Sequence, residues 1–378
     1  MRPFATRLRT ACRLAAWVLV ALSFGSSASA QTAPAGRPLK LVIAGLVHGH
    51  VHSFLHSAVD RSDVQLVGVY DPDPALLAAA LAERKLPSSV GFADLEKMLT
   101  ETAPEAMAIF SSTGDHPALV AAAAKHHVHA MMEKPLAVSV ADGDAIARSA
   151  KDGGIHVIVN YETTWYPSMA ETWRLMKQPS AGRVRKLVAM DGHEGPKEIN
   201  VQPEFLAWLT DPVKNGGGAL YDFGCYGANL MTWLMENERP RSVFALTQRQ
   251  KPAVYARVDD EATILVEYAG AQGIIQASWN WPFGRKDFEV YTEHAYAIAT
   301  GGGTLRVRTG QQEERTTPPP LAPDLQDSIS YLTAVVRGTR QPDGPSSLAN
   351  NLIVTEILAA ARESAQTGKA VRLADATH

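Results

Sequence analysis

Three side chains from two distant stretches of the sequence could together move a proton. Asp222 and Tyr226 lie four residues apart in NGGGALYDFGCYGANLMTWL, at the start of a predicted helix, so both should lie on one face of it. A carboxylate and a phenol on one face can position a hydroxyl and relay its proton. If Lys134 lies nearby, its charge would lower the pKa of the phenol from about 10 towards the range of a base at neutral pH. The alternative is an aspartate that caps the helix and a tyrosine packed in the core.

Lys134 is the central residue of Glu133-Lys134-Pro135, which directly follows a buried apolar strand. Ligands bind at the carboxyl ends of strands in parallel sheets. Pro135 restricts Lys134 to extended conformations, so the ammonium group is aimed in one direction, and the bond between the two residues can be cis. We expect Glu133 to stabilise this turn. The alternative is a solvated Glu-Lys pair.

Strands and helices alternate in the first part of the chain, where short apolar runs are followed by segments with helical spacing. The alternation predicts a doubly wound parallel sheet over residues 39–158. The predicted strands are 39–44, 65–70, 106–110 and 128–132, and the predicted helices are 46–59, 74–83, 118–126 and 139–153.

From residue 159 to residue 378 the pattern changes. Five strand-like runs, among them RKLVAMDGHE and DFEVYTEHAYAIAT, follow each other through short turns, with helices before and after them. This pattern indicates an open, mostly antiparallel sheet. The predicted fold class is therefore α/β, with a parallel sheet domain followed by a second α/β domain.

The turn after the first strand is where the pyrophosphate of a dinucleotide would lie on helix amides. Gly45 takes the first position of G-x-G-x-x-G, but Val47 and His50 take the second and third, with Gly49 between them, so the motif is a weak signal. Asp71 ends the second strand. A carboxylate there accepts from the ribose hydroxyls and repels a 2′-phosphate, which favours NAD over NADP, whereas the alternative is a turn residue before a proline.

Further cofactor contacts are predicted around this turn and the lysine strand. They are His48, Glu133 and Lys134, together with Ser112, Thr113 and His116 in the loop after the third strand.

Four histidines near the same turn raise the question of a metal. His48, His52 and His56 have the i, i+4 spacing that places ligands on one helix face, while His50 points elsewhere. No acidic residue is close to them in sequence. We therefore predict no metal site, and expect a histidine near the helix N-terminus to contact phosphate instead.

Residues 1–30 have the pattern of a secretory signal peptide, followed by a linker over 31–38. Four arginines precede a short apolar run, and Ala28-Ser29-Ala30 forms a small-residue cleavage site before Gln31. The run is too short for a membrane span, and no other span is predicted. We expect an exported protein, periplasmic or extracellular.

The charge and cysteine content of the mature chain exclude some functions. Loss of the leader leaves 32 basic and 39 acidic residues without a long basic run, which argues against nucleic-acid binding. Cys225 is then the only cysteine, so the domains depend on their cores and not on a disulfide.

Several stretches together resemble the Gfo/Idh/MocA oxidoreductase family, which includes glucose–fructose oxidoreductase, inositol dehydrogenases and dihydrodiol dehydrogenases. They are MEKPLAVSVADG, NYETTWYP, the NGGGALYDFGCYG stretch and SLANNLIVTEILAAARESAQTGKAVRL. The resemblance implies an N-terminal Rossmann domain and a C-terminal domain whose open sheet often forms an oligomer interface, hence a homo-oligomer. It also implies that Lys134 lies beside the nicotinamide and the substrate. Many members have histidine where this chain has Tyr226.

From these observations we hypothesise an NAD(P)-dependent oxidoreductase that transfers hydride between nicotinamide and a sugar or polyol carbon. Tyr226 would be the acid/base, Lys134 would polarise the reacting oxygen and Asp222 would orient substrate hydroxyls. Asn160, Tyr161 and Trp165 would line the entrance, with His193 and Glu194 reaching the substrate from a strand end.

Export makes a tightly bound NAD (or NADP) the expected form of the cofactor, because free NAD is scarce outside the cytoplasm. Two alternatives stay open. One is an NAD-dependent glycosidase that oxidises, eliminates, hydrates and reduces without net redox change. The other is a sugar-binding protein without catalysis, which would hold no nucleotide.

Overall fold

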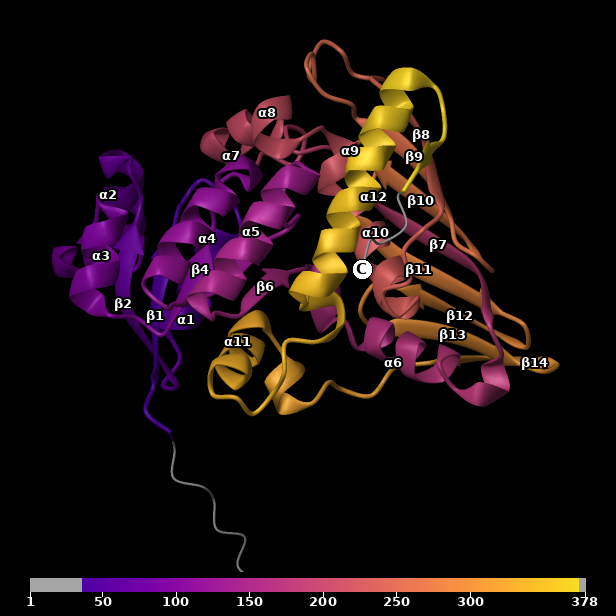
Figure 1. Cartoon of the computed structure of the whole chain (residues 1–378), viewed down its shortest axis with the longest axis horizontal. Helices are drawn as coiled ribbons and strands as arrows, with labels where there is room; N and C mark the ends of the chain where they lie inside the picture. The colour runs from indigo at the N-terminus through magenta and orange to yellow at the C-terminus, as the bar shows by residue number, and fades with distance from the viewer. Residues whose placement is uncertain (1–35, 374–378) are drawn as a thin grey trace, which may run out of the picture. The chain divides into compact units, whose positions relative to one another are not determined.

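The structure, a computed structural model, describes residues 36–373. The predicted signal peptide lies outside the described residues, as does most of the predicted linker. The chain from Pro38 onwards forms one compact unit that contains two sheets (Figure 1).

The first sheet has six parallel strands in the order β3-β2-β1-β4-β5-β6. The central strand β1 is buried at almost every residue, as expected for a parallel strand covered on both faces. The strands are β1 (Leu39–Ala44), β2 (Val64–Tyr70), β3 (Gly91–Phe92), β4 (Ala106–Ile109), β5 (His129–Glu133) and β6 (Val157–Asn160).

Five helices and three short 3-10 turns connect or extend these strands, and a fourth turn lies just before the second sheet. Several begin at the side-chain caps that the sequence supplies: Asp73 caps α2, Asp94 caps α3 and Ser139 caps α5. The helices are α1 (Val51–Val59), α2 (Pro74–Glu83), α3 (Leu95–Thr102), α4 (His116–Lys125) and α5 (Val140–Gly153), and the turns are η1 (Ser88–Val90), η2 (Thr113–Asp115), η3 (Glu162–Trp165) and η4 (Pro179–Ala181).

The second sheet has nine strands in the order β14-β13-β12-β11-β7-β10-β9-β8-β15, antiparallel except for the pair β7–β10. The strands are β7 (Val184–Gly192), β8 (Ser242–Gln248), β9 (Glu261–Glu267), β10 (Gln272–Ser278), β11 (Arg285–Thr292), β12 (Ala295–Thr300), β13 (Thr304–Thr309), β14 (Gln312–Thr316) and β15 (Val371–Arg372).

Helices cover one face of the second sheet and also join it to the first. Helix α10 packs on β7 and β10, and α12 contacts both α10 and the Rossmann helix α5 (Figure 1). The elements are α6 (Pro167–Met176), α7 (Pro203–Leu209), α8 (Pro212–Asn215), α9 (Ala219–Asp222), α10 (Gly224–Leu234), α11 (Ser328–Val336) and α12 (Leu348–Thr367), with the turns η5 (Pro323–Leu325) and η6 (Gly344–Ser346).

The predicted fold class is confirmed: a parallel Rossmann sheet is followed by a mixed, mostly antiparallel sheet. Strand β3 and helix α3 were not predicted, because β3 is only two residues long and α3 is mostly polar. Strand β6 spans the predicted domain boundary at residue 158, and the boundary stays a prediction.

Within the described residues, no helix combines the length and the apolar character that a membrane crossing needs.

Candidate functional site

A buried ion pair links the end of β5 to the second half of the chain. Lys134 Nζ lies 2.5 Å from Asp222 Oδ1 and donates to the Asp222 carbonyl oxygen at 3.0 Å. The other carboxylate oxygen accepts from Trp279 Nε1 at 2.9 Å. The Lys134–Pro135 bond is cis, as the sequence allowed. Lys134 is therefore held by the turn at one end and by Asp222 at the other.

Both members of this pair are charged at neutral pH. Burial raises the pKa of Asp222, but Lys134 outweighs burial and holds that pKa at about 2. Burial lowers the pKa of Lys134, and the Asp222 carboxylate again outweighs it, so that this pKa is raised. The predicted proximity of Lys134 and Asp222 is thus observed.

Tyr226 lies beside this pair but not on the same helix as Asp222. Asp222 ends α9, Phe223 interrupts, and Tyr226 lies in α10, so the predicted single helix face is wrong. The Tyr226 ring lies between two ammonium groups: Lys134 Nζ is 5.1 Å and Lys286 Nζ 5.0 Å from its centroid. These contacts nevertheless bring the three predicted residues into one cluster.

The prediction that Lys134 lowers the pKa of Tyr226 is also wrong. Burial raises that pKa well above its usual value, and nearby carboxylates, Glu162 first among them, add to the effect. Tyr226 is therefore a protonated phenol at neutral pH and can donate its proton.

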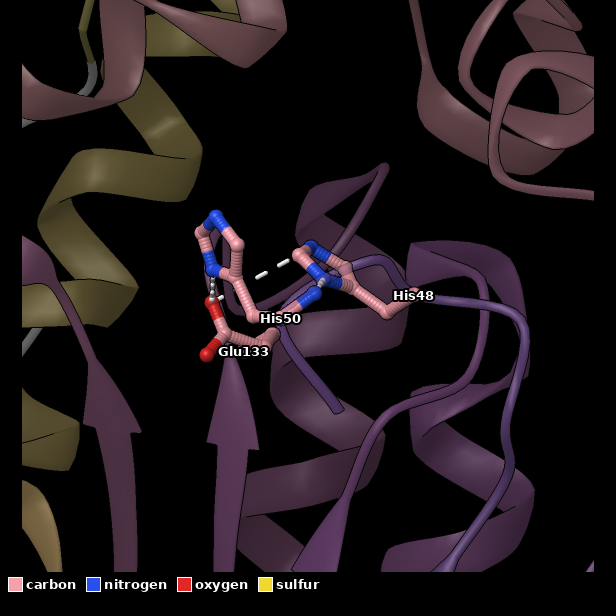
Figure 2. A group of neighbouring side chains, drawn as sticks. All are labelled: His48, His50 and Glu133. Carbon is pink, nitrogen blue, oxygen red and sulfur yellow. Dashed lines mark hydrogen bonds and ion pairs between the residues drawn. The ribbon is translucent and has the colours of Figure 1, made fainter. Parts of the chain in front are cut away.

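A second polar group surrounds Glu133. His50 Nδ1 lies 3.2 Å from one carboxylate oxygen, and Asn160 Nδ2 donates to the other at 2.7 Å. Trp165 Nε1 donates to Asn160 Oδ1 at 2.9 Å. Figure 2 shows His50 over the Glu133 carboxylate, with His48 beside it. Burial raises the pKa of Glu133, but His50, His48 and Asn160 outweigh it and hold that pKa at about 2.

This group opens onto a cavity of about 640 Å³ at the carboxyl edge of the parallel sheet. Asn160 and Trp165 therefore lie where an entrance was predicted, but Tyr161 does not. Tyr161 is fully buried, and its ring meets Tyr226 edge-on at 5.5 Å. The cavity is lined by residues of α1, β5, β6, η3 and α11 and by residues next to α1 and β4, among them His50, Ser53, Phe54, Phe110, Glu133, Asn160, Glu162, Trp165 and Ile329.

The histidines with i, i+4 spacing are not gathered around one point. His52 pairs with Glu83 and His56 with Asp60 on the surface, away from His48. The structure instead brings His48, His50 and Glu133 within 4.8 Å of one another. His48 Nδ1 accepts from the His50 backbone N–H, so the neutral ring carries its proton on Nε2, which faces Glu133.

The phosphate turn is held by Asp71. Its carboxylate accepts from the N–H of Leu46 at 2.7 Å and from the N–H of Asp73 at 2.8 Å. Gly45 has a φ of +87°, and a Cβ there would lie 2.9 Å from the Ser111 nitrogen, so only glycine fits.

Helices α7 and α8 cover the turn and the crevice beside it. Phe205 and Trp208 pack on the His48 ring at 4.6 and 5.5 Å, and Trp208 Nε1 donates to the Val47 carbonyl at 3.1 Å. A Cβ added at Gly49 would lie 2.9 Å from the Phe205 ring.

The predicted contacts Asp71, Ser112, Thr113 and His116 all lie beneath the protein surface, each exposed by 2% or less. The polar groups of the crevice fit a dinucleotide: a carboxylate ends β2, and Thr113 Oγ1 and His116 Nε2 are buried without a partner. The covering helices do not fit, because Phe205 and Trp208 occupy the space over the turn. A dinucleotide therefore enters only when α7 and α8 move.

His193 and Glu194 differ in position. The His193 ring meets Phe223 edge-on at 4.8 Å and lies near Asp222. Glu194 acts on His193 through its charge, and its carbonyl oxygen accepts from Lys251.

Sequence reasoning missed Asp191, Lys286 and Glu162. Asp191 is buried on the inner face of β7 with both carboxylate oxygens unpartnered, and burial raises its pKa well above the usual value. Lys286 pairs with Glu162 and faces Tyr226. The alternation in β7, where Leu187 and Ala189 are buried, places Asp191 on the same inner face and could have revealed it.

Two family models match the chain. Residues 39–161 match the oxidoreductase family with an NAD-binding Rossmann fold, and residues 169–298 match the GFO/IDH/MocA C-terminal domain. The first match identifies the parallel sheet domain as an NAD(P)-binding Rossmann domain.

Distant relatives and solved structures agree with these matches. D-apiose dehydrogenase of Paraburkholderia graminis is 24% identical over 84% of this chain and 86% of its own. The NADP⁺-dependent scyllo-inositol 2-dehydrogenase IolU of Bacillus subtilis is 24% identical over 69% of this chain and 74% of its own. The aldose-aldose oxidoreductase of Caulobacter crescentus, at 19% identity, has the same fold over 89% of this chain and 100% of its own, with a TM-score of 0.77.

Replacing Lys134 should destabilise the fold, because it leaves the Asp222 carboxylate buried without a partner. In Lys134→Met, Asp222 keeps its burial but loses its ammonium partner, so we expect the free energy of unfolding at pH 7 to fall by about 3–5 kcal/mol. The low pKa of Asp222 stabilises the wild type above pH about 4, and this stabilisation is lost as the pH falls towards 2. The difference in the free energy of unfolding between the wild type and Lys134→Met, measured with urea, should therefore become smaller at acidic pH.

The matched control is Lys125→Met, which removes an exposed ion pair with Glu96 and should cost under about 1 kcal/mol. Equal losses in the two variants would contradict the role of Lys134.

Replacing Trp208 should speed the exchange of a dinucleotide. Trp208→Ala removes the ring on His48 and the donor to Val47, together worth about 1.4 kcal/mol or more, which corresponds to about a tenfold faster opening of the cover. Stopped-flow exchange of bound for added NAD⁺ would measure this. Trp173→Ala, which removes a tryptophan stacked on Trp233 elsewhere, should leave the exchange rate unchanged. An unchanged rate in Trp208→Ala would show that α7 does not control the crevice.

Proposed function

Because the chain belongs to the Gfo/Idh/MocA oxidoreductase family, we propose that Lys134, Asp222 and Tyr226 are the catalytic cluster of an NAD(P)-dependent sugar or polyol dehydrogenase. At the level of the family the activity is the oxidation or reduction of CH–OH groups. Sugars and polyols are supported as substrates by the distant D-apiose and scyllo-inositol dehydrogenases. The observation that carries the assignment of the residues is the fixed Lys134–Asp222 pair beside Tyr226 at the end of β5.

The state of each side chain defines its step. Two donors of the Lys134 ammonium group are used by Asp222, which leaves the third for a substrate oxygen. Tyr226, kept protonated by burial, gives its proton to that oxygen when a carbonyl is reduced. Oxidation of an alcohol is the reverse step and requires that Tyr226 first loses its proton. The nicotinamide, when bound, supplies or accepts the hydride.

Further polar groups near the cluster could hold the hydroxyls of a sugar. Asp191 offers two unpartnered carboxylate oxygens, and the buried Tyr161 hydroxyl also lacks a hydrogen-bond partner. His193 lies near Asp222 and Lys134. A substrate that hydrogen-bonds to buried groups of this kind binds more tightly than one that leaves them unpaired.

The covered crevice supports a dinucleotide that is slow to leave. A cofactor held beneath α7 and α8 exchanges only as fast as the cover opens. Tight retention also suits the export that the first 30 residues predict, since an exported enzyme has little free NAD to draw on. Asp71 supports NAD over NADP.

A second candidate, an exported NAD-dependent glycosidase, is favoured by one observation. His50, oriented by Glu133, is a second polar group that can carry a proton, and it lines the cavity at the end of β5. Elimination and hydration need such a group in addition to the one that serves hydride transfer.

Nucleotide retention is the first test. The protein, purified from the compartment to which it is exported and then denatured, should release close to one NAD per chain, identified by absorbance and mass. NADP instead of NAD would contradict the argument from Asp71. An empty protein that also fails to bind added NAD⁺ at millimolar concentration would leave the sugar-binding alternative.

The same sample tests export and assembly. If the leader is cleaved as predicted, the intact mass should be that of a chain that begins at Gln31. Phe244, Leu246 and Leu265 are exposed on the outer face of β8 and β9, which supports a homo-oligomer through this sheet. Light scattering should then give a mass above that of one chain.

Removing the Tyr226 hydroxyl should slow the reaction with little effect on binding. For the sugar or polyol that a substrate panel identifies, Tyr226→Phe should lower kcat by about 10²–10⁴-fold and leave KM and nucleotide content close to the wild-type values. Tyr291→Phe, at the opposite end of β11 from Lys286, is the control. A kcat within twofold of the wild type would remove Tyr226 from the mechanism.

A further inference from the structure

A second cavity, of about 420 Å³, lies between the last turns of α12, the end of β8 and the segment that leads into α9. Helix α12 packs beside β8 and α9 (Figure 1). Three arginines from three separate segments line this cavity: Arg249 directly follows β8, Arg257 lies between β8 and β9, and Arg362 lies in α12. The cavity shares no lining residue with the cavity at the end of β5 and is a separate site.

Two of the three guanidinium groups have no acidic partner. In the part of the chain that the structure describes, neither Arg249 nor Arg362 forms an ion pair. Each donates to a backbone carbonyl instead, Arg249 to that of Ala256 at 2.6 Å and Arg362 to that of Gly216 at 3.2 Å. A guanidinium group has five N–H donors, so most of the donors of these two arginines are left for a ligand.

The carboxylates around the cavity do not balance this charge. Asp259 is the one acidic residue of the lining, and its two oxygens accept from the N–H groups of Gly218 and Leu220 at 2.9 and 2.7 Å. Arg257 pairs with Asp211 at 3.2 Å, but the arginine side chain is 61% exposed, and a surface pair of this kind is exchanged for another anion at little cost. The whole chain has a net charge of −3, so the basic lining is a local feature.

The remaining lining indicates the kind of anion. Guanidinium groups bind phosphate through paired hydrogen bonds, and a phosphate ester offers three acceptor oxygens and nearly two negative charges to three arginines. The cavity has the volume of a small-molecule site and leaves room for more than the phosphate. Polar side chains that can hold hydroxyl groups also line it, namely Thr247, Gln248 and Gln366. We propose that the cavity binds a phosphorylated sugar, with its phosphate group between the three arginines.

The floor of the cavity connects this site to the Lys134–Asp222 pair. Arg362 lies over the Tyr221 ring, 5.3 Å from its centroid, and the Tyr221 hydroxyl donates to the Val138 carbonyl at 3.0 Å. Val138 lies four residues after Lys134, and Tyr221 directly precedes Asp222. A phosphate that fixes Arg362 therefore also orders the segment that holds Asp222. The consequence for catalysis rests on the proposed function, whereas the binding site does not.

Isothermal titration calorimetry of the full mature chain with glucose 6-phosphate tests the site. We expect saturable binding by the wild type in about 0.15 M NaCl, where attraction between distant surface charges is largely screened. Arg249→Gln should weaken this binding by about tenfold or more, because it removes a charge-assisted hydrogen bond to the phosphate. Arg249 is exposed, so the variant should unfold in urea like the wild type. Inorganic phosphate should bind more weakly than the sugar phosphate.

Arg308→Gln is the matched control. Arg308 also donates to a backbone carbonyl, that of Gly310 at 3.1 Å, but lies on β13 and outside the cavity. Its replacement should leave the affinity unchanged. Absence of saturable binding by the wild type, or equal affinities in the wild type and Arg249→Gln, would overturn the proposal. Inorganic phosphate that binds as tightly as glucose 6-phosphate would overturn the assignment to a sugar phosphate.

Hydrogen exchange tests the link to the proposed active site. With glucose 6-phosphate bound, the backbone amides of residues 216–222 should exchange more slowly in the wild type, and should change less in Arg249→Gln at the same concentration. Binding without this protection would overturn the link to Asp222. Both measurements are made without added dinucleotide, so failure to retain NAD would overturn the proposed function alone.

Discussion

The buried pair of Lys134 and Asp222 is the contact on which the arrangement of the site depends. An ammonium group at the end of a parallel strand would lose hydration without compensation if Asp222 were not there, and the same holds for the carboxylate. Because Lys134 belongs to the Rossmann sheet and Asp222 to the helices over the second sheet, the pair fixes one half of the chain against the other. Tyr226 then takes its position from both, since α10 begins two residues after Asp222 and its ring lies against the ammonium group.

The closed crevice adds a cost to cofactor binding that the family fold alone does not imply. Phe205 and Trp208 bury apolar surface against His48, and a dinucleotide must displace that packing before it reaches Thr113 and His116. The apparent affinity is the intrinsic one reduced by the fraction of molecules that are open. A rigid cover that closes again behind the cofactor makes release slow for the same reason. Under the proposed function, such a cover would favour retention of the cofactor over its rapid exchange.

Sequence reasoning recovered the parts of the site that depend on local pattern. Lys134 is recognised by the proline after it, Asp71 by its place after a strand, and Gly45 by the turn that it begins. The position of each residue in the fold therefore follows from the residues next to it in the sequence. Contacts between distant segments were not recoverable in this way. Nothing near Phe205 or Trp208 in sequence indicates that they cover the phosphate turn, and Lys286 reaches Tyr226 only through the pairing of β11 with β7. The pKa of Tyr226 was predicted in the wrong direction because the charge of Lys134 is visible in sequence and the loss of solvent is not.

Tyr226 and His50 lie on either side of β5 in different surroundings. Burial and neighbouring carboxylates keep Tyr226 protonated, whereas the carboxylate of Glu133 directs an exposed imidazole to accept a proton. Glu133 and Lys134 are adjacent in sequence, so the end of a single strand orients both groups: Glu133 holds His50 and Lys134 contacts Tyr226. A dehydrogenase needs only one of these groups, and the presence of both is the physical reason to look for chemistry beyond hydride transfer.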